Sequence, residues 1–206
     1  GDVYKRQIDA RLAIASRAQA AVLRFARARG LPVIPLIRTA DFAPQVVQAI
    51  LETPRRRAAV ADMIARLVLD HDYAGINIDF EGPFGAYRAP FSDFMARLAA
   101  LLHPAGKQLS VDVVPQFDPL AQIPASSGAA PFDYRALAES CDAVILMAYA
   151  HADRTPGSLA PLWWVRAATA CALKEVPAAK LVVGQSFYGR HWIVNGSQIT
   201  HSDLTQ

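Results

Sequence analysis

The residues best suited to chemistry lie in one short run, Gly75-Ile76-Asn77-Ile78-Asp79-Phe80-Glu81. Apolar and polar side chains alternate along this run, and the alternation predicts a β-strand whose two faces differ. Asn77, Asp79 and Glu81 share the polar face. Burying two carboxylates and an amide is costly unless each finds a partner, so this face favours a functional site over a polar part of the core.

Two carboxylates at this spacing are suited to acid–base catalysis. Their Cα atoms lie about 6.6 Å apart along a strand, and repulsion between them raises the pKa of one, as a general acid requires. We predict that Glu81 is the acid and Asp79 its partner. The alternative is a magnesium site formed by the same pair. The sequence shows no third carboxylate at the end of a neighbouring predicted strand, which disfavours a metal, and it indicates no other cofactor.

The elements that must position this run alternate between helices and strands. The sequence predicts helices over residues 10–29, 54–68, 91–102, 134–139 and 162–174, and strands over residues 32–37, 75–81, 109–114, 143–149 and 181–186. Largely apolar strands that alternate with helices form parallel sheets with helices on their outer face. Because no strand is followed by a Gly-rich phosphate loop, we predict an α/β fold of the (β/α) barrel type. Glu81 then lies near the rim where barrel enzymes have their active sites.

The composition is that of a globular domain, since 53% of the 206 residues are hydrophobic and 19% are charged. No apolar run approaches about 20 residues, the length of a membrane span. The net charge is +3, and arginines cluster at residues 24–29 and 55–57. These clusters lack the aromatic residues and motifs of a nucleic-acid site, so we interpret them as solvated helix faces. Cys141 and Cys171 lack metal-ligand spacing and are predicted to be buried free thiols.

The motifs together resemble those of glycoside hydrolase family 18. Residues 74–81 are similar to its strand-four signature, Asp-Gly-x-Asp-x-Asp-x-Glu, in the form typical of bacterial spore-cortex and germination hydrolases. Met147-Ala148-Tyr149 is similar to the Met-x-Tyr at the end of strand six, and residues 184–192 resemble the end of strand seven. The resemblance covers residues 20–192. It implies a partial (β/α)8 TIM barrel, in which strands three to seven are present and the first two and the last are missing.

The resemblance also implies a reaction. Members cleave β-1,4-linked N-acetylglucosamine glycans, such as chitin or peptidoglycan and its cortex form, with retention and with the substrate's own 2-acetamido group as nucleophile. Glu81 would protonate the glycosidic oxygen, Asp79 would hold the acetamido N–H, and Tyr149 would donate a hydrogen bond to the acetamido oxygen. The implied partner is a polysaccharide that contains N-acetylglucosamine. We expect five further residues to bind it: Asn77, Met147, Tyr188, Trp192 and Gln116.

Two departures from the family's pattern bear on activity. Asn77 replaces the aspartate that lies two residues before Asp79 in the signature, and we expect its amide to donate a hydrogen bond to Asp79. Ala150 follows Tyr149 where many members carry aspartate, which removes a polar contact to the sugar. These departures keep a second hypothesis open, in which the barrel binds N-acetylglucosamine glycans without cleaving them.

The length of 206 residues is below that of a complete barrel, which has about 250. We therefore predict that residues 8–206 form an incomplete catalytic barrel and that residues 1–7 are non-native or disordered. We expect this chain alone to be weakly active or inactive. The resemblance favours a secreted or cell-envelope location, although the chain begins without a signal peptide.

Overall fold

The computed structural model describes residues 5–9, 14–16, 20–82, 84–117, 123–124, 126–152, 156–195 and 198–205. A seven-stranded sheet is formed by β1 (Lys5–Ile8), β2 (Ile14–Ser16), β3 (Leu36–Thr39), β4 (Gly75–Asp79), β5 (Gln108–Val113), β6 (Ala143–Leu146) and β7 (Leu181–Val183). The strand order is β2-β1-β3-β4-β5-β6-β7. β1 and β3 to β7 are parallel, and β2 pairs antiparallel with β1.

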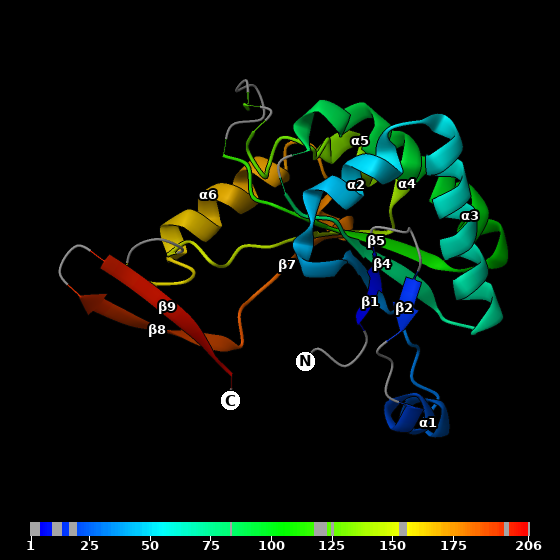
Figure 1. The fold of residues 1–206 in the computed structure, drawn as a ribbon, viewed down its shortest axis with the longest axis horizontal. Helices are drawn as coiled ribbons and strands as arrows, with labels where there is room; N and C mark the ends of the chain where they lie inside the picture. The colour runs from blue at the N-terminus through cyan, green and yellow to red at the C-terminus, as the bar shows by residue number, and fades with distance from the viewer. Residues whose placement is uncertain are drawn as a thin grey trace.

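Helices connect the parallel strands. They are α1 (Ala20–Ala28), α2 (Pro44–Leu51), α3 (Pro54–Asp70), α4 (Arg88–Leu102), α5 (Tyr134–Ser140) and α6 (Leu162–Ala172). Figure 1 shows α2 to α5 gathered along one side of the sheet, with α1 apart from them. The start of α3 is as the sequence predicts, because Pro54 occupies its first turn and the Thr53 hydroxyl accepts a hydrogen bond from the Arg56 N–H.

The core lies between β4 and the helices. Ile76, Ile78 and Phe80 are fully buried. The Phe80 ring lies 6.2 Å from that of Phe91 and 5.9 Å from that of Phe94, measured between ring centroids, and both partners belong to α4. The apolar face of β4 is therefore the one packed on helices, as its alternation predicts.

The polar face of β4 points to the opposite side of the sheet, which a closed barrel would enclose. A cavity of about 440 Å³ lies on that side, lined by residues from four neighbouring strands, among them Leu36, Asn77, Ser110 and Ile145. The parallel sheet with helices on one side and polar strand residues on the other confirms the prediction of an α/β partial barrel.

The structure differs from the sequence prediction in several elements. The sequence predicts a helix over residues 10–29, but residues 14–16 form β2, whose backbone adds to the edge of β1, and α1 begins only at Ala20. β1 itself is a sixth parallel strand, and it includes residues 5–7 of the segment predicted to be non-native or disordered. Residues 1–4 lie outside the described ranges. α2 was not predicted, although four of its apolar side chains are buried.

A β-hairpin follows the sheet, formed by β8 (Tyr188–Asn195) and β9 (Gln198–Thr205). Figure 1 shows it projecting from the sheet on the side of α6. Arg190 connects the hairpin to the rest of the molecule, because its guanidinium donates to the carbonyl of Ala152 at 2.8 Å. The same guanidinium also joins the two strands, since it donates to the carboxylate of Asp203 on β9 at 2.8 Å. Tyr188 and Trp192 follow the last strand that the sequence predicts, at residues 181–186, and the structure places both in β8.

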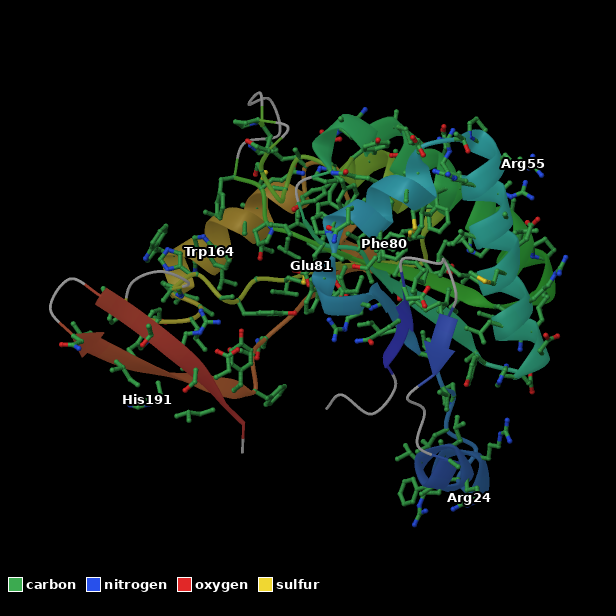
Figure 2. All side chains as sticks on the ribbon, in the orientation of Figure 1. Arg24, Arg55, Phe80, Glu81, Trp164 and His191 are labelled. Carbon is green, nitrogen blue, oxygen red and sulfur yellow. The ribbon has the colours of Figure 1, made fainter. Side chains whose placement is uncertain are left out.

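Most of the clustered arginines face solvent, as predicted: Arg24, Arg27, Arg29, Arg55 and Arg56 are exposed. Arg57 differs, because its side chain is only 15% exposed and donates to the carbonyl of Leu51. Figure 2 shows Arg24 and Arg55 far from Glu81, which lies near the middle of the molecule. Both cysteines are buried free thiols. No helix in the described ranges is long and apolar enough to cross a membrane.

Gly75 allows β4 and β5 to approach each other closely. A Cβ atom at this position would lie 2.3 Å from the backbone oxygen of Gln108, far inside van der Waals contact. At Gly128, by contrast, a Cβ would meet nothing within 4 Å. The close approach of the two backbones therefore requires glycine at the first residue of β4.

We predict that Gly75→Ala lowers the free energy of unfolding by about 3 kcal/mol, because backbone atoms must move to accommodate the methyl group. The matched control Gly128→Ala changes it by less than about 0.5 kcal/mol. Guanidinium unfolding measures both changes. Equal effects of the two substitutions would contradict the close packing of β4 on β5.

Ala150 adopts a left-handed backbone conformation, with φ of 63°. This conformation costs an L-residue about 1 kcal/mol or more, and glycine avoids that cost. We predict that Ala150→Gly raises the free energy of unfolding by about 1 kcal/mol, measured by thermal and denaturant unfolding. Ala148→Gly, at a buried position with no positive φ, serves as the control and destabilises the protein. A loss of stability in both variants would rule out strain at Ala150.

Candidate active site

β4 places the two predicted catalytic carboxylates at its carboxyl end. Asp79 is the last residue of the strand and is 6% exposed, and Glu81 follows two residues later and is half-buried. Asn77, two residues before Asp79 in the strand, is 8% exposed. The three residues alternate with the helix-facing side chains of Ile76, Ile78 and Phe80, so they point to one side. The structure thus places the three residues of the predicted polar face on one side of the sheet.

A hydrogen-bonded chain crosses from β4 to β5 on this face. The Ser110 hydroxyl donates to the Asn77 side-chain oxygen at 3.0 Å, and the Asn77 amide donates to Asp112 Oδ2 at 2.9 Å. The sequence analysis expected the Asn77 amide to donate to Asp79, and this was wrong. The pairing of Asn77 with Ser110 across the two strands places Asp112 within reach of the amide instead.

Asp112 is thus a third carboxylate of the site, which the sequence analysis missed. It is 8% exposed. Burial raises the pKa of Asp112 to about 6, and the negative charge of Glu81 also raises this pKa, while the hydrogen bond from Asn77 opposes the rise. The statement that no neighbouring strand supplies a carboxylate is therefore corrected. The signal was present, since polar Ser110 and Asp112 alternate with apolar Val111 and Val113.

Tyr149 reaches the same place from the segment after β6. Burial, and after it the nearby charges of Asp112, Asp79 and Glu81, raise its pKa to about 12. Its ring packs close to the backbone of β7, because a Cβ on Gly184 would lie 3.0 Å from Tyr149 Cε1. The phenol is therefore held among the carboxylates and stays protonated at neutral pH.

The predicted substrate-binding residues have different surroundings. Tyr188 packs edge-on against Tyr149, with ring centroids 6.4 Å apart. Met147 is half-buried two residues before Tyr149, and Trp192 is half-buried on β8 beneath the Arg190 guanidinium. Gln116 is 6% exposed, and its amide nitrogen donates to the carbonyls of Ala129 and Phe132. Gln116 thus holds the loop before α5, and its predicted contact with substrate stays a prediction.

Arg38 is a second residue that the sequence analysis missed. It lies at the carboxyl end of β3 in register with Asp79, and residues paired in parallel strands face the same side of a sheet. Its guanidinium lies 4.1 Å from the ring centroid of Phe42. Two of its nitrogens, Nε and Nη1, are buried without a hydrogen-bond partner among the described residues. The site therefore carries a cation next to its carboxylates.

Aromatic side chains gather near the carboxyl ends of β5 and β6. The ring of Phe117 lies 5.6 Å from that of Trp164, and His151 lies 5.3 Å from both Trp163 and Trp164, between ring centroids. Figure 2 shows Trp164 on α6. Trp163 is 65% exposed and Phe117 is 49% exposed. Exposed aromatic faces of this kind stack well on sugar rings.

Among the residues that the structure describes, no group of three or more histidine, cysteine, aspartate and glutamate side chains could hold a metal ion. A magnesium site formed by Asp79 and Glu81 alone stays an alternative prediction. Asp112 uses one oxygen to accept the Asn77 hydrogen bond. The arrangement brings three carboxyl groups and a half-buried phenol together, which suits proton transfer and the binding of an amide group.

Comparison with known proteins finds relatives of the chain. Over 170 residues the chain is 29% identical to YdhD of Bacillus subtilis (strain 168), a protein named as a sporulation-specific glycosylase, covering 82% of this chain and 39% of that protein. Over 143 residues it is 30% identical to the cortical fragment-lytic enzyme of the same organism, covering 68% of this chain and 32% of that protein. The chain thus spans less than half the length of these relatives.

The fold agrees with a solved structure. The chitinase from Chromobacterium violaceum ATCC 12472 superposes with a TM-score of 0.81 at 25% identity, covering 91% of this chain and 61% of that one. This coverage agrees with the predicted partial barrel. The sequence profile of glycosyl hydrolases family 18 matches residues 42–205, which include β4, Tyr149 and the β8–β9 hairpin. The chain therefore belongs to glycosyl hydrolases family 18.

Proposed function

We propose that this chain carries the catalytic site of a hydrolase that cleaves β-1,4-linked N-acetylglucosamine glycans with retention. One observation carries the proposal. The charges of Asp112, Asp79 and Glu81 all act on the Tyr149 phenol, so residues from three separate segments lie close together. A general acid, a buried carboxylate and a half-buried phenol in one place are the groups that an acetamido-assisted cleavage needs.

The proposed reaction has two steps. The acetamido oxygen of the substrate attacks the anomeric carbon, the glycosidic bond breaks, and the leaving oxygen takes the proton of Glu81. Asp79 accepts a hydrogen bond from the acetamido N–H and stabilises the positive charge that develops on this group. Water then attacks the anomeric carbon, its proton passes to Glu81, and the acetamido group is restored.

Tyr149 acts as a hydrogen-bond donor in this scheme. Because burial and neighbouring carboxylates raise the pKa of Tyr149 to about 12, its hydroxyl keeps its proton at neutral pH. A neutral phenol donates to the acetamido oxygen and orients it towards the anomeric carbon. Tyr188 packs against the same ring and limits its movement.

The relatives support a bacterial cell-wall glycan as the substrate. One is named a cortical fragment-lytic enzyme and another a sporulation-specific glycosylase, while the superposed structure is a chitinase. We therefore propose peptidoglycan or its cortex form ahead of chitin. The exposed aromatic side chains near α6 offer stacking surfaces for the sugars on either side of the cleaved bond.

A second candidate is a glycan-binding protein without turnover. Ala150 favours it, because the position after Tyr149 lacks the aspartate of many members and its methyl group makes no polar contact to a sugar. In this case the chain would bind N-acetylglucosamine oligomers and release no product. Assays of binding and of product release on the same protein separate the two candidates.

We predict that Glu81→Gln lowers the rate of hydrolysis about 100-fold or more, because the glutamine cannot donate a proton to the leaving oxygen. The measurement is the release of new reducing ends from N-acetylglucosamine oligomers and from peptidoglycan glycan strands. Glu139→Gln is the matched control, since it makes the same chemical change on the exposed surface of α5.

Release by Glu81→Gln at the wild-type rate would remove Glu81 from the mechanism. Tight binding of oligomers by the wild-type chain, with no release at all, would favour the second candidate. A chelator added to the assay leaves the wild-type rate unchanged, because the proposed steps use no metal. Loss of turnover with chelator would favour the magnesium alternative.

We predict that Tyr149→Phe lowers kcat about 100-fold with little change in the thermal unfolding midpoint, since one preorganised hydrogen bond is lost and the ring remains. Steady-state kinetics and thermal unfolding measure the two effects. Tyr87→Phe, at a half-buried tyrosine on the helix side of the sheet, is the control and keeps kcat. An unchanged kcat in Tyr149→Phe would show that the phenol hydroxyl does not contact the reacting group.

A further inference from the structure

Arg38 is a half-buried cation that the proposed reaction does not use. It lies on β3, and its backbone is in register with that of Asp79 on β4. Paired residues of parallel strands face the same side of a sheet, and neighbouring strands lie about 4.8 Å apart. The two side chains therefore begin next to each other at the carboxyl ends of their strands, on the side of the sheet that carries Asn77 and Glu81.

The ring of Phe42 packs against the Arg38 guanidinium. The Cζ atom of Arg38 lies over this ring, 4.1 Å from its centroid. A stacked arginine uses the flat face of its guanidinium, and its N–H groups, which lie in the plane of that group, remain available as donors. Phe42 itself has φ of 51°, which is a steric outlier for a large side chain. Backbone strain of this kind is concentrated at functional sites, so Phe42 is a first indication of a ligand here.

The second indication is that donors of Arg38 are buried without an acceptor. Its Nε and Nη1 atoms have no hydrogen-bond partner among the described residues. A buried donor without an acceptor is costly, and more so when it belongs to a charged group. Native structures keep few such groups, and each requires an explanation. An acceptor that belongs to a ligand explains both nitrogens.

The strand order shows which part of a glycan Arg38 faces. β3 and β5 lie on opposite sides of β4, and Tyr149 follows β6. Arg38 and Tyr149 are therefore on opposite sides of Asp79. Since Asp79 and Tyr149 hold the acetamido group in the proposed reaction, Arg38 faces a part of the glycan beyond that group. Chitin offers only hydroxyl and neutral amide groups there, whereas peptidoglycan carries carboxylates on its lactyl ethers or on the peptide stems attached to them.

We propose that Arg38 binds a carboxylate of the glycan and so makes the site selective for peptidoglycan over chitin. The inference rests on the proposed function for the glycan as the ligand. Hydrogen bonds between charged groups are about twice as strong as neutral ones, and a guanidinium matches a carboxylate in shape. The cation also offsets the repulsion that Asp79, Glu81 and Asp112 exert on an acidic glycan.

Binding to the Glu81→Gln chain tests the proposal without cleavage of the ligand. The first ligand is peptidoglycan glycan strands whose stems an amidase has removed, so that each lactyl carboxylate is free. The second is the same strands with these carboxylates converted to neutral methylamides. We predict by isothermal titration calorimetry that the acidic strands bind about 10-fold more tightly than the methylamide strands.

Substitutions at position 38 assign this preference to the guanidinium. We predict that Arg38→Met, in the same chain, abolishes or reverses the preference and leaves the affinity for neutral N-acetylglucosamine oligomers nearly unchanged. Arg38→Lys keeps the charge without the planar donor group and retains part of the preference. Arg24→Met is the matched control, because Arg24 is exposed and far from Glu81, and it keeps the full preference (Figure 2).

Strands with intact stems form a second pair of ligands, before and after the same methylamide conversion. Their lactyl carboxyls are bonded to the peptide, so a preference in this pair alone places the bound carboxylate on the stem. Equal affinities within both pairs overturn the proposal, and this comparison needs no variant at position 38. A preference that persists in Arg38→Met, with an unchanged thermal unfolding midpoint, also overturns it.

Hydrolysis by the wild-type chain keeps the two claims apart. Selective binding of acidic strands without any release of product contradicts the proposed reaction alone. Release of product from acidic and methylamide strands that bind equally well contradicts the role of Arg38 alone.

Discussion

Negative charge buried on the open side of a parallel sheet is the constraint on which this structure depends. Asp79 and Asp112 are each less than 10% exposed, and Glu81 lies next to them. Such a group of carboxylates persists only when fixed dipoles and shared protons compensate it. The Ser110–Asn77–Asp112 chain supplies fixed dipoles, and the protonated phenol of Tyr149 supplies a further donor. In the proposed reaction the substrate amide therefore enters a site whose polar groups are already oriented.

The rest of the molecule holds these groups in place. Phe80 packs on Phe91 and Phe94 of α4, which fixes the rotation of β4 and so directs its polar side chains away from the helices. The close approach of β4 and β5 at Gly75 sets the register that pairs Asn77 with Ser110. Gly184 leaves room for the Tyr149 ring against β7. Packing on the helix side of the sheet therefore determines the geometry of the proposed active site on the other side.

The sequence was sufficient for features that depend on local pattern. Alternation along residues 75–81 predicted both faces of β4, and the Thr53 cap predicted the start of α3. Features that depend on how distant segments pair were not predictable in this way. Asp112 lies inside a segment that is mostly apolar, and its role follows from the register of β5 against β4. Residues 14–16 pair with β1 although their composition favours a helix. The Gln116 side-chain nitrogen donates to the carbonyls of Ala129 and Phe132, two residues distant from it in the sequence.

The central claim is that Asp79, Glu81 and Tyr149 form one site for an N-acetylglucosamine unit. A crystal structure of the Glu81→Gln chain with an N-acetylglucosamine tetramer tests it most directly, because it needs binding and not turnover. We predict that the acetamido group of one sugar lies between Asp79 and Tyr149, with its glycosidic oxygen next to position 81. A tetramer bound elsewhere, or bound with its acetamido groups turned away from both residues, would contradict the account.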